Sequence, residues 1–270
     1  MTDKSRKLSL NHRLRYLAYF VLAVVLFYIV GNFLYSQIFK VVPDHAYYVF
    51  PTIGFHENVK KVLVFSPHPD DETLAAAGYI QEAKKDDIEV RIILITDGNF
   101  RGQGEKRQNE FKKSASDLGI EDKNLVFLNY KDNGLKSISQ NDLETAFKQQ
   151  IDDFLPQVVI YPSHLDENSD HRATGLAIEK ILDSNENVEK YAYLVHYKGY
   201  PYPRKLATNR FLMPPSKLFF SCQWYKFVLT PEEIQKKLEV LRNYKVSLSY
   251  PIEGGYLQSF VRQNELFCQE

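Results

Sequence analysis

The feature that most constrains this chain is a stretch of about 24 residues, from Tyr16 to Phe39, without a charged side chain. At 1.5 Å rise per residue, a helix of this length exceeds the roughly 30 Å hydrocarbon thickness of a bilayer. A buried helix of a globular protein would show a polar face, and a cleaved signal peptide would have a shorter apolar run. The stretch therefore predicts a transmembrane helix over residues 16–39 that acts as an uncleaved anchor.

The charges that flank this stretch predict its orientation. After it, Lys40 is the only Lys or Arg before Lys60. Before it lie five basic residues, which are Lys4, Arg6, Lys7, Arg13 and Arg15. Because cytoplasmic flanks carry an excess of Lys and Arg, residues 1–15 are expected to form a basic cytoplasmic arm. The rest of the chain would lie outside the cytoplasm, where Cys222 and Cys268 could pair or remain separate buried thiols.

The overall composition narrows the class of protein. The 34 Lys and Arg residues balance 34 Asp and Glu residues, so the net charge is zero. Without an overall cationic field, nucleic acid is not an expected partner. The hydrophobic fraction of 44% and the charged fraction of 25% are those of a folded chain, which excludes a wholly disordered protein.

Beyond the anchor, apolar runs alternate with segments rich in Ala, Lys, Glu and Gln. Residues 40–60 have no sustained period and predict a juxtamembrane linker. The apolar runs that follow are 61–65, 90–96, 124–128 and 157–161. Such alternation is typical of βαβ units, and strands that are apolar throughout are typical of a parallel sheet covered on both faces. We therefore expect one domain over residues 61–270, a Rossmann-like three-layer α/β sandwich with a mainly parallel sheet.

The C-terminal part continues the pattern less regularly. Two more strands are expected at 191–197 and 224–229, followed by a helix that starts at Pro231 behind the N-cap Thr230. Between these strands, residues 198–221 contain four prolines and no clear period, so they predict a long loop. Loops of this length often border a site, and this one is expected to influence the choice of substrate.

Ligands bind at the carboxyl ends of parallel strands, so the residues after each run are candidates for a site. The first run is followed by SPHPDDE (66–72), which places one imidazole and three carboxyl groups at a strand-to-helix turn. This concentration of negative charge is costly unless a cation lies there. Zn²⁺ in hydrolytic sites takes His and carboxylate ligands and keeps one position open. A zinc site is therefore predicted with His68 and Asp71 as ligands, and with His171 or His164 as the third.

The motifs PHPDDE (67–72) and SDHRATG (169–175) resemble those of the PIG-L/LmbE family of zinc-dependent N-deacetylases, which act on N-acetylglucosamine-containing substrates. The similarity extends to the segments 96–120 and 259–267 and so covers essentially residues 61 to 267. This resemblance implies a metal-dependent amide hydrolase with His68, Asp71 and His171 as zinc ligands. It implies Asp70 as the general base that takes a proton from the attacking water.

The resemblance also assigns supporting roles. Arg107 and Asp132 would bind the hydroxyl groups of the sugar. From their positions beside the ligands, Asp170 is expected to hydrogen-bond to a metal ligand, and Glu72 to do the same or simply to stabilise the helix N-terminus. His196 follows a strand run in an aromatic segment, which favours a structural or an exposed position over a contact with the substrate.

One position departs from the family's pattern. Many relatives have His-Pro-Asp-His where this chain has Asn-Ser-Asp-His at 168–171, and the first His is thought to stabilise the oxyanion or protonate the leaving amine. Asn168 could donate a hydrogen bond to an oxyanion but cannot transfer a proton at neutral pH. We expect His164 to serve as the acid in its place, or Asp70 to shuttle the proton itself.

The leading hypothesis is a membrane-anchored N-deacetylase for an N-acetylglucosamine-type sugar in a glycolipid or envelope glycoconjugate, with the bilayer as a second partner through residues 16–39. One alternative is a deacylase of another amide metabolite, because the metal chemistry acts on the amide alone. Another is a catalytically inactive membrane-bound glycan-binding module, because of Asn168. A catalytic domain on the cytosolic side is the alternative orientation. No feature of the sequence specifies an oligomeric state.

Overall fold

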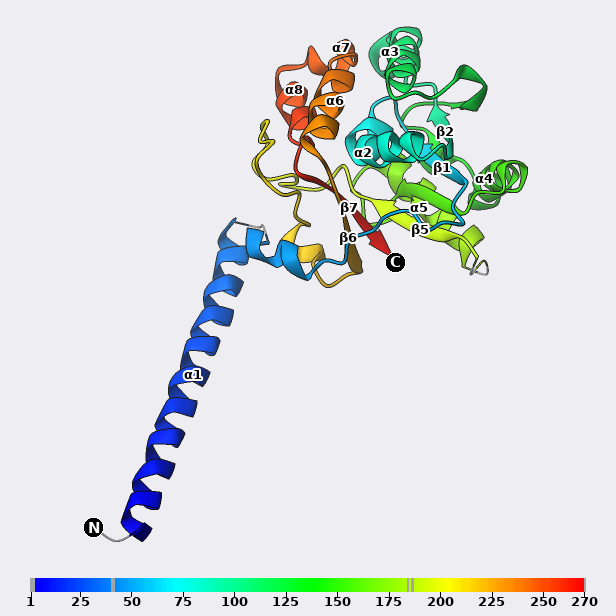
Figure 1. The fold of residues 1–270 in the computed structure, drawn as a ribbon. Coiled ribbons are helices and arrows are strands. Elements are labelled where there is room, and N and C mark those ends of the chain that lie inside the picture. Colours follow the sequence, from blue (N-terminus) through cyan, green and yellow to red (C-terminus); the bar gives the residue numbers. More distant parts are fainter. Residues whose placement is uncertain (1–2, 40–41, 184, 186, 270) are drawn as a thin grey trace.

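The computed structural model describes residues 3–39, 42–183, 185 and 187–269, and Figure 1 shows its fold. The helices are α1 (Asp3–Phe39), α2 (Asp71–Lys85), α3 (Gly104–Asp117), α4 (Gln140–Phe154), α5 (Ser169–Leu182), α6 (Pro231–Leu241), α7 (Lys245–Leu248) and α8 (Pro251–Gln258). The strands are β1 (Lys61–Ser66), β2 (Glu89–Thr96), β3 (Leu125–Tyr130), β4 (Val158–Pro162), β5 (Glu189–Tyr193), β6 (Gln223–Val228) and β7 (Asn264–Gln269).

The seven strands form one mostly parallel sheet in the order β3-β2-β1-β4-β5-β7-β6. Strands β1 to β5 run parallel to one another, and β7 is antiparallel to both of its neighbours. Strands β1, β2 and β4 are almost wholly buried because helices cover both faces of the sheet. The expectation of a mixed α/β fold with a mostly parallel sheet is therefore confirmed, and the first four predicted strands match β1 to β4 to within two residues.

The helices form two packed groups. Helix α2 lies on β1 and β2 and packs against α6, whereas α4 and α5 pack against each other and contact β1 and β4. Figure 1 shows the two groups on opposite sides of the sheet, with α3, α7 and α8 beside α6. Helix α6 begins as expected, because Thr230 and Glu233 form a reciprocal capping box around Pro231. The helices thus cover both faces of the sheet.

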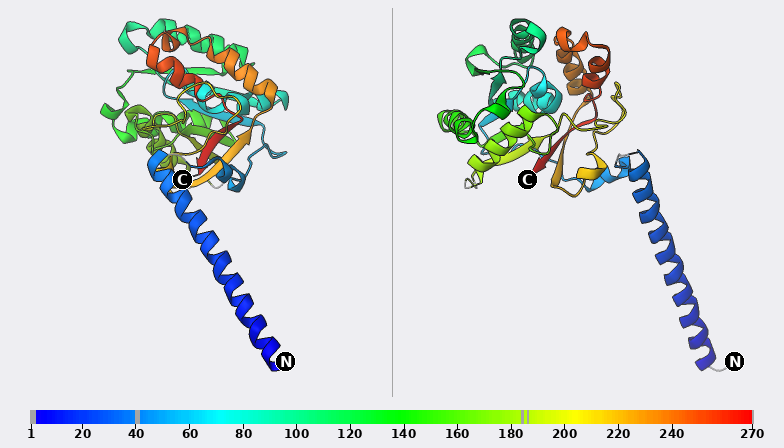
Figure 2. Two further views of the ribbon diagram at one scale, coloured as in Figure 1. Left: turned by 90° about the vertical axis from the view of Figure 1, so that its left-hand side faces the viewer. Right: turned by 180° about the vertical axis from the view of Figure 1, so that it is seen from behind.

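Helix α1 extends away from the α/β part in all three ribbon views (Figures 1 and 2). It begins at Asp3, so residues 3–15 of the predicted basic arm are part of the same helix. The window His12–Tyr35 has a mean hydropathy of 2.3 and none of it is buried. By length and composition this helix could cross a membrane.

The segment that follows α1 packs on the domain. The 3-10 helix η1 (Asp44–Val49) is followed by Phe50 and Ile53, which are 5% and 7% exposed and belong to the hydrophobic core. The backbone N–H of Ile53 donates to the carbonyl of Lys226 in β6 at 2.9 Å. The packed part of the chain therefore begins before Lys61, although residues 40–60 lack the periodicity that would have predicted it.

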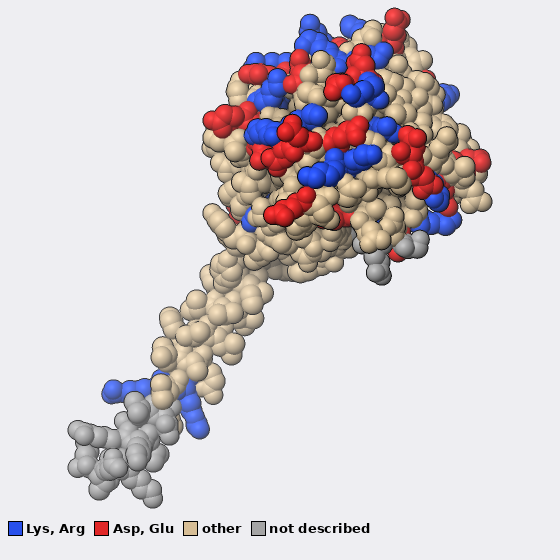
Figure 3. Space-filling view, turned by 45° about the vertical axis from the view of Figure 1, so that its right-hand side comes forward, with Lys and Arg blue, Asp and Glu red and all other residues tan. Residues whose placement is uncertain are grey.

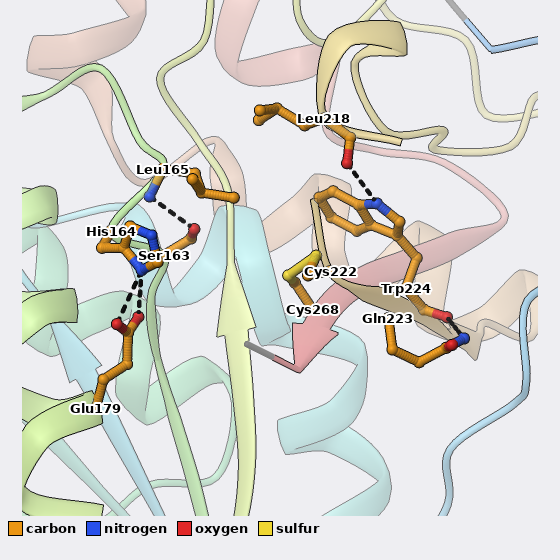
Figure 4. Close-up of a disulfide and its surroundings, with 9 residues drawn as sticks. All are labelled: Ser163, His164, Leu165, Glu179, Leu218, Cys222, Gln223, Trp224 and Cys268. Carbon is orange, nitrogen blue, oxygen red and sulfur yellow. Dashed lines mark hydrogen bonds and ion pairs between the residues drawn. A yellow bond between two sulfur atoms is a disulfide. The ribbon is translucent and has the colours of Figure 1, made fainter. Parts of the chain in front are cut away.

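Strand β7 separates two strands that are neighbours in sequence order. It lies between β5 and β6, and its residue Cys268 is bonded to Cys222 with Cα atoms 5.9 Å apart (Figure 4). The sequence had left the pairing of these cysteines open. Strand β7 itself was not predicted, because its first residues are the polar Asn264 and Glu265, which are fully buried.

Candidate active site

The candidate site lies where the winding of the sheet changes direction. From β1 the chain continues to β2 on one side, and from β4 it continues to β5 on the other, while β1 and β4 are neighbours. At such a switch point the two connecting loops separate and leave a crevice at the carboxyl ends of the strands. The loop 67–70 and the loop 163–168 therefore meet here, although about a hundred residues separate them in sequence.

Three side chains from these loops and the helices that follow them converge on one point, with His68 in the first loop, Asp71 at the start of α2 and His171 in the first turn of α5. The Asp71 Oδ2 atom lies 3.3 Å from His68 Nδ1 and 3.0 Å from His171 Nε2, and the two nitrogens are 3.3 Å apart. Ligands about 2.0–2.2 Å from a tetrahedral metal are separated by about 3.3–3.6 Å, close to these spacings. Asp71 Oδ1 is buried without a hydrogen-bond partner among the described residues. These residues could therefore hold a metal ion.

The charges of the group favour a bound cation. Burial lowers the pKa of His68, but the carboxylates of Asp170 and Asp71 raise it to about 9 overall. Burial likewise lowers the pKa of His171, and Asp71 and Asp166 raise it to about 10. Burial raises the pKa of Asp71, yet the two imidazoles hold it well below its usual value. Both imidazoles would thus carry protons that a metal ion would displace.

Two further carboxylates orient the imidazoles. Asp170 Oδ2 lies 3.3 Å from His68 Nε2 and accepts a hydrogen bond of 2.7 Å from the backbone N–H of Asn133. Asp166 Oδ2 lies 3.2 Å from His171 Nδ1 and accepts from the backbone N–H of His196 at 2.8 Å. A carboxylate on the second nitrogen fixes the tautomer and orientation of a metal-binding imidazole and raises its basicity. Asp170 and Asp166 therefore each contact one of the two imidazoles.

Asp70, the residue before α2, lies beside these groups and lines a cavity next to them. Its Oδ2 accepts a hydrogen bond of 2.9 Å from Ser247 Oγ and lies 3.6 Å from Arg107 Nη2. Burial raises the pKa of Asp70 to about 7, against the opposing effects of the Arg107 cation and the Ser247 hydroxyl. A carboxylate with a pKa near neutrality suits a general base. The φ angle of Asp70 is 126°, a backbone conformation that residues other than glycine rarely adopt. Such strained conformations cluster at functional sites.

Glu72 is fully buried and supports the loop rather than lining the cavity. Its carboxylate accepts hydrogen bonds from Ser66 Oγ at 3.1 Å, from Thr73 Oγ1 at 2.7 Å and from the hydroxyl of Tyr244. Ser66 Oγ also donates to the carbonyl of His68 at 2.8 Å. Glu72 therefore ties the turn that carries His68 to α2 and to the segment before α7.

The cavity beside these groups has a volume of about 280 Å³. His68, Asp70, Arg107 and Asp132 line it, together with Asn168. Its outer wall comes from Phe100 in the 3-10 helix η2 (Phe100–Gly102), from Ser247 in α7 and from Tyr256 and Leu257 in α8. A polar floor with an aromatic wall suits a ring-shaped polar substrate.

Comparison with known proteins bears on the chemistry. Residues 63–182, which include both strand-end loops, match the family model described as PIG-L: GlcNAc-PI de-N-acetylase. Residues 63–182 thus form a PIG-L domain. Relatives that match it are N-acetylglucosaminyl deacetylases.

Two curated relatives of the PIG-L domain illustrate the match. A probable N-acetyl-alpha-D-glucosaminyl L-malate deacetylase 2 from Bacillus anthracis is 29% identical over 140 residues, covering 47% of this chain and 61% of the relative. The diacetylchitobiose deacetylase of Thermococcus kodakarensis is 30% identical over 139 residues, covering 46% and 50% respectively. The chain thus spans 61% of the length of the first relative and 50% of the length of the second.

Solved structures share the fold over a longer part of the chain. The N,N'-diacetylchitobiose deacetylase from Pyrococcus horikoshii superimposes with a TM-score of 0.53 at 18% identity, covering 89% of this chain and 91% of that one. The A40926 pseudoaglycone deacetylase Dbv21 superimposes with a TM-score of 0.58 at 16% identity, covering 78% and 97%. At these identities the likeness shows the fold alone.

The PIG-L domain does not bring His164 to the cavity. His164 Nδ1 lies 2.8 Å from Glu179 Oε2 of α5, and His164 is not among the residues that line the cavity (Figure 4). The expected stand-in for the missing His is therefore directed toward α5. Asn168 does line the cavity, and its Oδ1 also caps α5 by accepting from the N–H groups of Asp170 and His171.

Arg107 and Asp132 are both at the cavity but already contact each other. Arg107 Nη1 lies 3.3 Å from Asp132 Oδ2, and its Nη2 donates to the carbonyl of Pro69 at 3.2 Å. Arg107 therefore holds the loop that carries Asp70, in addition to any contact with a substrate.

The sequence did not single out several residues of this site. Asp166 was not assigned a role, although it lies only five residues before His171, in the loop that leads into α5. Ser247 and Tyr256 lie in short helices that no motif marked. His196 was expected to be structural or exposed, and it lines the cavity with its ring centroid 4.7 Å from that of His171. No residue of the long segment 198–221 lines the cavity among the described residues.

Proposed function

We propose that this chain is a zinc-dependent hydrolase that removes the N-acetyl group from an N-acetylglucosamine-type sugar in an envelope glycoconjugate or glycolipid. The observation that carries the proposal is the convergence of His68 Nδ1, Asp71 Oδ2 and His171 Nε2 beside the Asp70 carboxylate. Two imidazoles and one carboxylate are the ligand set of many hydrolytic zinc sites. The names of the relatives, which are deacetylases of N-acetylated sugars, support the class of substrate.

Each group at the cavity has a part in this reaction. A bound zinc ion would polarise the acetamide carbonyl and lower the pKa of a water molecule. Asp70 would accept the proton of the attacking water, with its Oδ2 positioned by Ser247 and Arg107. The same carboxyl group can return the proton to the leaving amine, since Asn168 cannot transfer a proton at neutral pH and His164 lies outside the cavity. Asn168 can donate its amide hydrogen bond toward the carbonyl oxygen.

The test uses the full chain purified in detergent. We expect about one zinc per chain and acetate release from N,N'-diacetylchitobiose that a chelator abolishes and added Zn²⁺ restores. His171→Ala should lose the metal, whereas the matched control His164→Gln, which lies outside the cavity, should keep it. Acetate release that persists without metal would contradict the proposal.

We further propose that α1 spans a membrane with residues 1–15 in the cytoplasm and the PIG-L domain outside it. The basic residues before the helix and its exposed apolar surface support this topology. The Cys222–Cys268 disulfide also supports it, since disulfides persist in oxidising compartments. A reporter enzyme that works only outside the cytoplasm should be active when it is fused after Glu270. Activity of a cytoplasm-dependent reporter at the same position would reverse the topology.

A further inference from the structure

Outside α1, the most exposed large hydrophobic side chains gather in one place. Among the described residues they are Phe220, Tyr48 and Val49, which are 92%, 75% and 70% exposed. Every other exposed large hydrophobic side chain beyond α1 is less accessible than these three. A water-soluble surface rarely gathers such groups without a partner.

The three side chains belong to one surface built from two segments. Tyr48 and Val49 end η1, and Phe220 follows the 3-10 helix η5 (Ser216–Leu218). The segments touch through Phe50 and Phe219, whose ring centroids are 5.9 Å apart, and Phe219 lies 4.8 Å from Phe220. Figures 1 and 2 show the two segments side by side in every view. We call Tyr48, Val49 and Phe220 the η1–η5 patch.

The patch rests on a packed support, so its exposure does not come from a loose segment. The ring of Tyr47 stacks on Phe211 with centroids 3.7 Å apart. Lys226 Nζ donates to the carbonyl of Tyr47 at 2.9 Å, and Tyr47 itself is only 7% exposed. Tyr48 and Val49 therefore project from a segment whose inner side is fixed to β6.

The position of the patch points to what covers it. Tyr48 follows the last residue of α1, Phe39, by nine residues, so the patch lies close to the end of the membrane helix. In Figure 3 the visible surface of the domain where it meets α1 shows few charged side chains, whereas Lys, Arg, Asp and Glu are abundant farther from α1. Exposed aromatic side chains beside a membrane helix match a bilayer interface, because aromatic side chains concentrate there.

We propose that the η1–η5 patch inserts into the interfacial layer of the same bilayer that α1 crosses. The domain then rests on the membrane through Phe220, Tyr48 and Val49 rather than moving freely on a tether. This inference goes beyond the hydrolase activity, since it concerns neither the metal nor the substrate. It adds a second, non-spanning contact to the one made by α1.

The experiment places a fluorescent reporter on the patch in the full chain. Phe220→Trp and Tyr48→Trp are reconstituted into phosphatidylcholine vesicles with acyl chains brominated near the headgroup, and the native Trp224, 3% exposed, gives the baseline. Asn109→Trp, at an exposed position of α3 on the far side of the domain, is the matched control. We expect brominated lipid to quench the added fluorescence at 220 and 48 by about half or more and to leave that at 109 unchanged.

Three outcomes would overturn the proposal in different ways. If alkaline carbonate extracts the protein, α1 does not span and neither membrane contact exists. If the protein resists extraction but Phe220→Trp is quenched no more than Asn109→Trp, the patch is not at the bilayer, and α1 alone anchors the chain. If the added indole of Phe220→Trp is protected from aqueous acrylamide but is not quenched by brominated lipid, a second copy of the chain covers the patch instead of the bilayer.

Discussion

At the scale of single residues, Asp70 combines the properties that the proposed reaction requires. It lies next to the ligand group, it lines the cavity, and its pKa is raised to about 7 chiefly by burial. Asp70→Asn keeps the volume of the side chain but removes its ability to accept a proton. We expect the rate constant for acetate release to fall by about 10²–10⁴-fold, the usual contribution of a general base, while zinc content stays unchanged.

The measurement is kcat on a soluble N-acetylated sugar together with the metal content of the same preparation. Ser247→Ala serves as the graded comparison, since it removes the hydroxyl that positions Asp70 but leaves the base itself. Its kcat should lie between those of the wild type and Asp70→Asn. A wild-type rate for Asp70→Asn would assign the proton transfer to another group.

The residues of the site differ in how far the sequence could predict them. His68 and Asp71 lie three positions apart on one turn, so a local pattern could mark them. His171 could be added because parallel strands bring their carboxyl ends together. Ser247 could not be predicted, because it lies 177 residues from Asp70 in sequence and contacts it only through the packing of α7. Such a contact leaves no local sequence pattern.

At the scale of elements, helix α5 must lie very close to the loop that follows β4. A Cβ atom on Gly175 would be 2.6 Å from the backbone N of His164 and 2.6 Å from the carbonyl oxygen of Pro162. Backbone atoms cannot yield as a flexible side chain would, so Gly175→Ala must displace α5. Because His171 lies on the same helix, we expect zinc affinity to fall by about tenfold or more, as it does when the supports of metal ligands are disturbed.

Competition with a chromophoric chelator measures that affinity, and thermal unfolding reports the accompanying loss of stability. Leu176→Ala is the matched control, because Leu176 neighbours Gly175 on the same helix but is 45% exposed. Its zinc affinity should match that of the wild type. Equal affinity in Gly175→Ala would show that α5 tolerates the added methyl group without moving His171.

Helix α2 shows a second dependence between distant elements. The helix is interrupted at Ala76, whose φ is −140°, and a buried ion pair satisfies the backbone groups around the break. Glu265 of β7 accepts from the N–H groups of Gly78 and Tyr79 at 2.8 and 2.9 Å. Lys237 of α6 donates to the carbonyl of Leu74 at 2.8 Å and to Glu265 at 2.7 Å.

Neutralising one partner of this pair should destabilise the domain. Glu265→Gln leaves the Lys237 cation buried without a counter-charge, and the expected loss of unfolding free energy is about 3–5 kcal/mol. The double variant Glu265→Gln, Lys237→Met removes both charges and should recover part of that loss. Denaturant unfolding followed by the fluorescence of Trp224 would measure both. A loss equal to the sum of the single effects would mean that the pair is not coupled.

This arrangement also explains why the sequence did not predict strand β7. A strand between two others is expected to be apolar throughout, yet β7 opens with Asn264 and Glu265. Asn264 accepts from the backbone N–H of Leu212 at 2.9 Å, and Glu265 serves α2, so their burial depends on partners far away in sequence. By contrast, β1 to β4 could be predicted because their side chains are apolar irrespective of what they contact.

At the scale of the whole molecule, the cavity and the membrane helix lie at different ends of the domain. The cavity is at the carboxyl ends of the strands, with α7 and α8 in its wall, and Figure 1 shows these elements on the side of the domain away from α1. If the η1–η5 patch rests on the bilayer, the cavity opens away from the lipid headgroups. A substrate must then reach beyond the headgroup layer or be free in solution.

This geometry predicts how substrates are ranked by the membrane-bound protein. For the wild type in vesicles, kcat/KM for water-soluble N,N'-diacetylchitobiose should exceed that for an N-acetylglucosaminyl phospholipid in the same bilayer by about tenfold or more, equivalent to roughly 1.4 kcal/mol. Transfer of the protein to detergent micelles should leave the rate on the soluble sugar unchanged, because the cavity does not depend on the bilayer. Acetate release measures both. Preference for the lipid-borne sugar would contradict the orientation and would require the domain to tilt until α8 meets the membrane.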